Sequence, residues 1–244
     1  HFSASERQTI HLIKQQLRDG YKLTVVARNN TPFAIEAGKL PCELISTRKF
    51  LPHHSTKIKK QCQLIHAHDE QGARWALTQH ILYNTPYIIT RRTAKSLSEK
   101  YLAEKAYQKA SALVGLSTDI VDSLQKNFPD KHCVKIPSSP ITYPLNQNKM
   151  DQIWASHAHR FLVMQATRLH KQKGFDITLE AARILQNKQS QVHFLLLGSG
   201  PEKDNLKKQA EGLRNVFFMS KQDDMGTWFA SANLLIHPSK EEGL

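Results

Sequence analysis

Short apolar runs alternate along the chain with amphipathic stretches of helical period. Residues 22–28 (KLTVVAR) form a β-branched run typical of a strand buried in a parallel sheet. A helix is predicted before it over 5–20, with Ser5 as N-cap and Gly20 as stop. The first half continues with predicted strands at 63–67, 87–90, 112–116 and 132–136, and helices at 72–83, 98–110 and 118–127.

The alternation lapses over residues 138–158, where prolines and polar residues predict a linker. It then resumes with strands at 160–166, 192–197, 216–219 and 232–237, and helices at 177–186, 202–211 and 223–230. Short connections between alternating strands and helices imply parallel strands, right-handed crossovers and helices on both sheet faces. The sequence therefore predicts an α/β protein with two Rossmann-like, doubly wound parallel-sheet domains, residues 1–137 and 159–244.

We expect both domains to be incomplete. No strand precedes the first predicted helix, although a Rossmann-like unit begins with a strand and a glycine-rich turn. At the other end the sequence stops at Leu244, where a loop leaves the last predicted strand.

Composition narrows the class of protein. The 244 residues are 40% hydrophobic and 23% charged, which excludes a disordered or collagen-like chain. Three cysteines without paired spacing indicate no zinc site, and no metal is predicted. The net charge of +13 attracts phosphates, nucleic acid or anionic lipid. Because no apolar run reaches the roughly 20 residues of a membrane span, we expect a cytoplasmic protein.

Two loops carry the candidate chemistry. The loop after the strand at 160–166 contains Arg168 and Lys173 and enters a helix beyond Gly174, which suits a diphosphate. A solvated basic loop is the alternative. The next strand runs into Gly198-Ser199-Gly200-Pro201, where glycine allows close backbone approach to a ligand, or serves only a tight turn.

In their order and spacing, these motifs resemble the retaining glycosyltransferase family four, which has the two-domain GT-B fold. The resemblance rests on Arg168-Leu169 with Lys173-Gly174-Phe175-Asp176, then Gly198-Ser199-Gly200-Pro201, Asp223-Asp224 and residues 230–239. It also includes Glu242-Gly243-Leu244, which is similar to the start of the family's Glu-x7-Glu element. In the first domain, residues 65–69 (IHAHD) resemble the family's His-x-His.

The resemblance implies a role for each matching residue. Arg168 and Lys173 would hold the donor diphosphate, with Gly198, Ser199 and Gly200 beside it. Glu242, with Glu241 as the fallback, would contact the transferred sugar, and His68 would be its neighbour in the first domain. Without the resemblance, His68 is read as a satisfied structural histidine.

Two segments depart from the family pattern. Arg91-Arg92 follows the strand at 87–90, where many relatives carry a histidine, and this change suggests a phosphorylated or acidic acceptor. Residues 136–140 (IPSSP) lack the glycine and aspartate of the usual Pro-x-Gly-x-Asp.

The predicted function is transfer of a sugar, with retention, from a nucleoside-diphosphate sugar to a glycan or lipid-linked acceptor, without any required cofactor. Peripheral contact with the cytoplasmic face of an anionic membrane is a further hypothesis, based on the basic residues Lys57, Lys59, Lys60, Arg91, Arg92 and Lys95. The alternatives are a GT-B-fold sugar-nucleotide epimerase and a nucleic-acid-binding protein. Nucleic acid is disfavoured because the chain shows no basic-aromatic run and no zinc finger.

Overall fold

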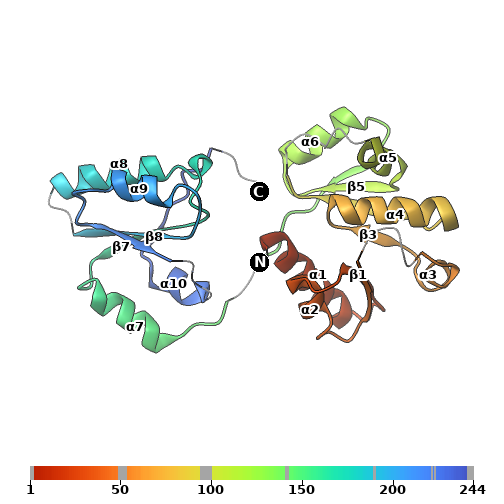
Figure 1. The fold of residues 1–244 in the computed structure, drawn as a ribbon, viewed down its shortest axis with the longest axis horizontal. Coiled ribbons are helices and arrows are strands. Elements are labelled where there is room, and N and C mark those ends of the chain that lie inside the picture. The colour runs from red at the N-terminus through yellow and green to blue at the C-terminus, as the bar shows by residue number, and fades with distance from the viewer. Residues whose placement is uncertain are drawn as a thin grey trace. The chain divides into compact units, whose positions relative to one another are not determined.

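The chain divides into two compact units (Figure 1). The computed structural model describes residues 3–48, 54–93, 101–140, 143–188, 191–220, 222 and 224–240. Unit 1 is built from residues up to Ile141, and unit 2 from Thr142–Glu242. Glu242, Glu241, Asp223 and Lys95 lie outside the described residues.

Unit 1 alternates helices and strands. Its elements are α1 (Ala4–Arg18), β1 (Thr24–Arg28), α2 (Pro32–Ala37), β2 (Glu43–Thr47), α3 (Thr56–Gln61), β3 (Ile65–Ala67), α4 (Glu70–Tyr83), β4 (Tyr87–Arg91), α5 (Tyr101–Lys109), β5 (Ala112–Gly115), α6 (Thr118–Asn127) and β6 (Cys133–Lys135).

The first helix begins two residues earlier than Ser5 as N-cap would require. Ser3 is the N-cap: its hydroxyl accepts from the Glu6 N–H at 3.2 Å, and its own N–H donates to Glu6 Oε2 at 2.6 Å. This capping box satisfies two N–H groups that the helix leaves unpaired, which favours Ser3 over Ser5. The stop is as predicted, because Gly20 takes a left-handed φ of 85° after the last turn.

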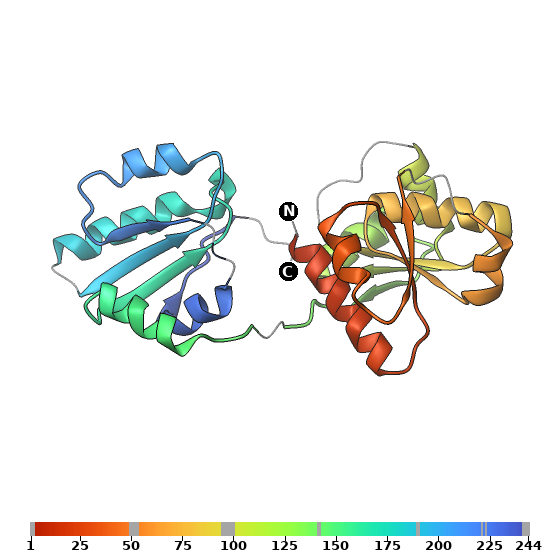
Figure 2. The same ribbon diagram turned by 60° about the horizontal axis from the view of Figure 1, so that its bottom comes forward.

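The strands of unit 1 form two parallel sheets, which Figure 2 shows from a second angle. Strands β1 and β2 pair beneath α1 and α2, around a core that includes Ile10, Ile13 and Val25. Strands β3, β4, β5 and β6 form the second sheet in that order. Helices α4, α5 and α6 pack on one face of it through residues such as Tyr87 and Leu113. In the described residues no backbone ladder joins the two sheets.

Unit 2 is doubly wound around a parallel sheet of order β10-β7-β8-β9. Its elements are α7 (Gln147–Ser156), β7 (Phe161–Ala166), η1 (Lys171–Lys173), α8 (Phe175–Asn187), β8 (Val192–Leu197), α9 (Lys203–Gln209), β9 (Val216–Met219), α10 (Met225–Ser231) and β10 (Leu234–Leu235).

The strands of unit 2 are buried on both faces because successive side chains point to opposite sides. Leu162, Met164 and Leu195 pack with α7 and α10, whereas Val163 and Leu196 lie in clusters with α8 and α9. Figure 1 shows these two helix pairs on opposite sides of the sheet. Helices on both faces of an apolar parallel sheet are what the sequence predicted for this unit.

Helix α7 lies within residues 138–158, which the sequence indicated as a linker, and it packs on α10 of unit 2. The Trp154 indole N–H donates to the Ser231 carbonyl at 2.8 Å. Lys149 Nζ lies 3.0 Å from an Asp224 carboxylate oxygen. The sequence did not predict this helix because few of its residues are apolar. Its contacts with unit 2 are made with residues about 75 positions further along the chain.

Candidate functional site at the strand ends

The candidate residues of unit 2 gather at the C-terminal edge of its sheet. Ligands of open parallel sheets bind at this edge, where the loops leave the strands. Three loops meet there, after β7, β8 and β9: the Thr167 N–H donates to the Leu197 carbonyl at 3.1 Å, and the Gly198 N–H to the Met219 carbonyl at 3.3 Å.

The basic loop after β7 is held by a buried amide. Gln165 is fully buried, and its Nε2 donates to the Lys173 carbonyl at 2.7 Å. The Thr178 hydroxyl of α8 donates to Gln165 Oε1 at 2.6 Å. Sequence analysis missed Gln165, although one polar residue inside an apolar strand is a usable signal. Arg168 is exposed, so its guanidinium is available to a ligand.

The same loop lies against the segment that follows β10. Gly174 has a φ of 67°, and a Cβ on it would lie 2.0 Å from the Pro238 carbonyl oxygen. The Lys240 N–H donates to the Gln172 carbonyl at 3.0 Å. The described chain thus brings the loop and residues 238–240 together, and the role assigned to Glu242 remains a prediction.

The glycine loop after β8 approaches the protein's own backbone. A Cβ at Gly198 would lie 2.0 Å from the Thr167 carbonyl oxygen, and one at Gly200 would lie 2.2 Å from that of Leu169. The Leu169 N–H donates to the Ser199 carbonyl at 3.1 Å. These contacts alone require glycine at both positions. The contacts of Gly198, Ser199 and Gly200 with a donor remain a prediction.

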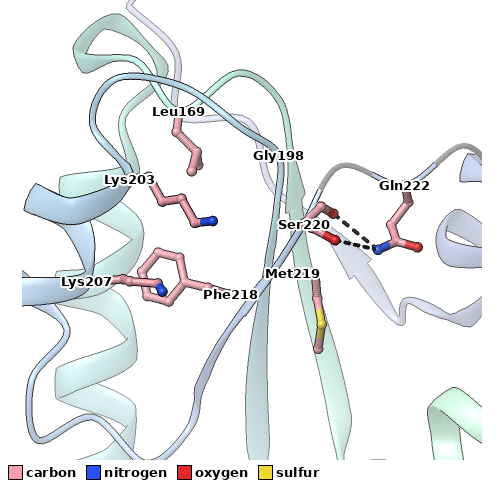
Figure 3. Close-up of a pocket in the computed structure, with 8 residues that line it drawn as sticks. All are labelled: Leu169, Gly198, Lys203, Lys207, Phe218, Met219, Ser220 and Gln222. Atoms are coloured by element: carbon pink, nitrogen blue, oxygen red, sulfur yellow. Dashed lines mark hydrogen bonds between the residues drawn. The ribbon is translucent and has the colours of Figure 1, made fainter.

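A cavity of about 390 Å³ opens beside these loops (Figure 3). Lys203 and Lys207 reach it from α9, towards Phe218 of β9. Gln222 closes another side, and its Nε2 donates to the Ser220 carbonyl at 3.2 Å. The full lining is Leu169, Gly198, Lys203, Lys207, Phe218, Met219, Ser220 and Gln222. Sequence analysis missed both lysines, which lie four residues apart just after the glycine loop.

In unit 1, His66 and His68 lie at the C-terminal end of β3, beside Thr90 of β4. The His66 Nε2 lies 2.7 Å from the Thr90 hydroxyl, and the two imidazole centroids are 4.0 Å apart. Burial first, then the nearby Arg92 charge, lowers the pKa of His66 to about 4. For His68, burial followed by His66 and Arg92 lowers the pKa to about 2. Both imidazoles are therefore neutral at pH 7.

Arg91 and Arg92 point to opposite faces of β4. Arg91 is only 6% exposed, and its Nη1 donates to the Tyr107 hydroxyl at 3.3 Å beneath α5. Its guanidinium also lies 5.7 Å from the centre of the Tyr107 ring. This burial removes Arg91 from the basic surface proposed from the sequence. Of that set, Lys57, Lys59 and Lys60 are exposed on α3.

Comparison with known proteins agrees with this geometry. Residues 160–244 match the family described as glycosyl transferases group 1. A Haemophilus influenzae protein described as an uncharacterized glycosyltransferase is 27% identical over 149 residues. That match covers 59% of this chain and 39% of the relative, so the chain spans well under half of it.

Solved structures share the fold over nearly the whole chain. HepE of Anabaena, crystallised with UDP, has a TM-score of 0.77 at 18% identity, over 99% of this chain and 72% of HepE. A glycosyltransferase of Rickettsia africae has a TM-score of 0.76 at 14% identity, over 97% of this chain and 69% of its own. The lipopolysaccharide outer core galactosyltransferase WaaB has a TM-score of 0.66 at 13% identity, over 100% of this chain and 72% of WaaB. The predicted fold class, two Rossmann-like units of the GT-B type, is confirmed.

Within the described residues, no helix combines the length and apolar character needed to cross a membrane.

Proposed function

We propose that this chain belongs to a glycosyltransferase that takes a sugar from a nucleoside-diphosphate sugar and transfers it to a glycan or lipid-linked acceptor. The observation that carries the proposal is the loop of Arg168 and Lys173 at the end of β7, within the segment that matches the family. This loop leads directly into α8, whose first N–H groups have no side-chain cap.

The donor diphosphate would lie between the basic loop and the start of α8. Arg168 offers a planar fork of donors, Lys173 a point charge, and the first turn of α8 a positive dipole end. The nucleoside would occupy the cavity beside Phe218, where Lys203 and Lys207 supply hydrogen-bond donors. HepE has been crystallised with UDP and with UDP-glucose, which supports a uridine donor.

We propose that the reaction proceeds through electrostatic stabilisation of the leaving group. Arg168 and Lys173 would neutralise the charge that develops on the departing diphosphate. The acceptor hydroxyl would attack from the same face, so that the anomeric configuration is retained. A double displacement would need a carboxylate nucleophile, and the motifs identify none. Glu242 and His68 would contact the transferred sugar.

Unit 1 would face the acceptor, and α3 would approach an anionic membrane. Lys57, Lys59 and Lys60 are exposed on this short helix, and each basic residue near such a surface contributes about 1 kcal/mol. The similarity to WaaB, a lipopolysaccharide galactosyltransferase, supports an envelope glycan or lipid-linked acceptor. Co-sedimentation with vesicles rich in phosphatidylserine at low salt tests the membrane contact, and absence of binding there contradicts it.

Calorimetric titration of the full-length protein with UDP tests the donor site. We expect Arg168→Ala to weaken UDP binding, because it removes a charge-assisted contact with the diphosphate. Arg160→Ala is the matched control, since Arg160 precedes β7 at the opposite edge of the same sheet. Equal UDP affinity in the two variants would contradict the proposal. The anomeric configuration of the product, read by NMR, tests retention.

A further inference from the structure

Four polar side chains project from one face of the β3-β4 pair. Alternation along the strands sends Ala67, Tyr87 and Ile89 into the core beneath α4 and α5. The residues between them, His66 and Thr90, point the other way and contact each other at 2.7 Å. His68 and Arg92 continue the same alternation just beyond the strand ends.

Arg92 is a half-buried cation that has no compensating anion among the residues that the structure describes. Its Nε is buried and has no hydrogen-bond partner, and within the described chain no carboxylate forms an ion pair with it. Burial lowers the pKa of its guanidinium, which reflects the cost of removing the charge from water. A charge in this position is destabilising until an opposite charge meets it.

The acidic residues that directly follow His68 are engaged elsewhere. The Asp69 Oδ1 accepts the Gly72 N–H at 2.6 Å as the N-cap of α4. Glu70 pairs with Arg74 one helical turn on, at 3.4 Å. Both contacts stabilise the start of α4, and neither carboxylate forms an ion pair with Arg92 in the described residues.

The two imidazoles add neutral donors beside this charge. A neutral imidazole carries one N–H, and the tautomer follows from the contact of the other nitrogen. The Nδ1 of His68 is buried and has no partner in the described residues. A neutral donor and an unpaired guanidinium on one face together match the lone pairs and the charge of an oxyanion.

We propose that Arg92, beside the neutral imidazoles of His66 and His68, binds an anionic group, a phosphate or carboxylate, carried by the acceptor, and thereby determines acceptor specificity. The inference rests on the proposed function in assigning the acceptor to unit 1. The proposed function assigns the donor diphosphate to Arg168 and Lys173 in unit 2. A second anion site at the end of β4 would therefore bind a different substrate.

Histidine side-chain NMR on the full-length protein tests the site with inorganic phosphate as the probe. We expect phosphate to shift the ring signals of His66 and His68, and to leave those of His157 and His193 in unit 2 unchanged. Arg92→Gln should weaken this binding by about ten- to a hundredfold, the loss of a hydrogen bond to a charged group. Arg92→Lys keeps the charge but loses the planar fork of donors, so its phosphate affinity should lie between those of the wild type and Arg92→Gln. Unchanged signals of His54 and His80, whose rings pack against Trp75 and Tyr87 in unit 1, confirm that unit 1 of a variant is folded.

The outcomes separate this inference from the proposed function. Phosphate binding that persists when UDP is saturating supports an acceptor site, whereas displacement by UDP would assign the anion to the donor and overturn the proposal. Equal phosphate shifts in wild type and Arg92→Gln, or none with either phosphate or acetate, would also overturn it. The relative affinities of phosphate and acetate identify the anion. His170, in the basic loop, reports UDP independently, so failure of the donor site is seen separately.

Discussion

The two units present their strand ends in different ways. At the edge of unit 2, close contacts between backbone segments shape the loops: a Cβ at Gly174, Gly198 or Gly200 would lie 2.0–2.2 Å from a carbonyl oxygen. The cation Arg168 stands exposed above them. At the edge of unit 1, half-buried side chains shape the surface, and burial, with a smaller effect of the Arg92 charge, lowers the pKa values of His66 and His68.

This difference indicates how each edge responds to mutation. In unit 2 the positions most sensitive to change should be glycines, because any side chain there collides with backbone that cannot move away cheaply. In unit 1 the sensitive positions should be charged or titratable, because burial makes electrostatic interactions stronger than they are in water.

The largest effect is expected for Gly174→Ala. A Cβ would lie 2.0 Å from the Pro238 carbonyl oxygen, in a backbone with a φ of 67°. Overpacking and left-handed strain together should cost roughly 2–5 kcal/mol of unfolding free energy. Gly212→Ala is the matched control in the same unit, since its φ is 82° but nothing lies within 4 Å of the added Cβ. Its cost should be roughly 1–2 kcal/mol, and equal denaturant midpoints for the two variants would disprove the steric argument.

Next in size is the loss of a donor cation. Arg168→Ala or Lys173→Ala should reduce donor use by about ten- to a hundredfold, since a hydrogen bond to a charged group is worth roughly 1.5–3 kcal/mol. The protein should stay folded because the Arg168 side chain is exposed. Steady-state kinetics with the full-length protein measures the effect. If Arg92→Gln changed donor use as much as Arg168→Ala, the two edges would not be functionally distinct.

Acidification should destabilise unit 1 through its histidines. His66 has a folded pKa near 4, below the value of 6.5 for an unperturbed imidazole, so the unfolded chain binds more protons as pH falls from 6.5 towards 4. Stability is therefore full above pH 6.5, and at pH 5 His66 should account for a loss of about 2 kcal/mol.

The variant His66→Asn should show a smaller fall in melting temperature between pH 7.5 and pH 5 than the wild type does. His132→Asn, at an exposed position, serves as the control. The pair His157 and His193 of unit 2 also has pKa values lowered by burial, so some pH dependence should remain. An unchanged pH dependence in His66→Asn would show that its imidazole is not held neutral.

The smallest effect is expected at the cavity beside the glycine loop. Lys203→Ala should weaken UDP binding by about two- to tenfold, as expected for one hydrogen bond of roughly 0.5–1.5 kcal/mol from a lysine on an exposed helix. Lys208→Ala is the control, because Lys208 is exposed on the same helix but does not line the cavity. Equal UDP affinities in the two variants would contradict the assignment of the nucleoside to this cavity.

The sequence by itself determined the fold class and the place of the basic loop. Strand β7 spans Phe161–Ala166 and β8 spans Val192–Leu197, close to the predicted ranges, because strands buried on both faces form continuous apolar runs. The strand β2 and the short helices α2 and α3 were not predicted. Each has only five or six residues and too little periodicity to be distinguished from a loop.

Only the tertiary structure decided which partner each residue has. Adjacent arginines look alike in the sequence, yet the pleat of β4 buries Arg91 against Tyr107 and leaves Arg92 beside the histidines. The sequence left the glycines of the loop after β8 open to a ligand contact or a tight turn, and the structure shows that a Cβ on Gly198 or Gly200 would meet the carbonyl of Thr167 or Leu169. Local sequence patterns encode periodicity and turns. These contacts, in contrast, join residues that are about 15 to 30 positions apart, and such residues become neighbours only when the sheet forms.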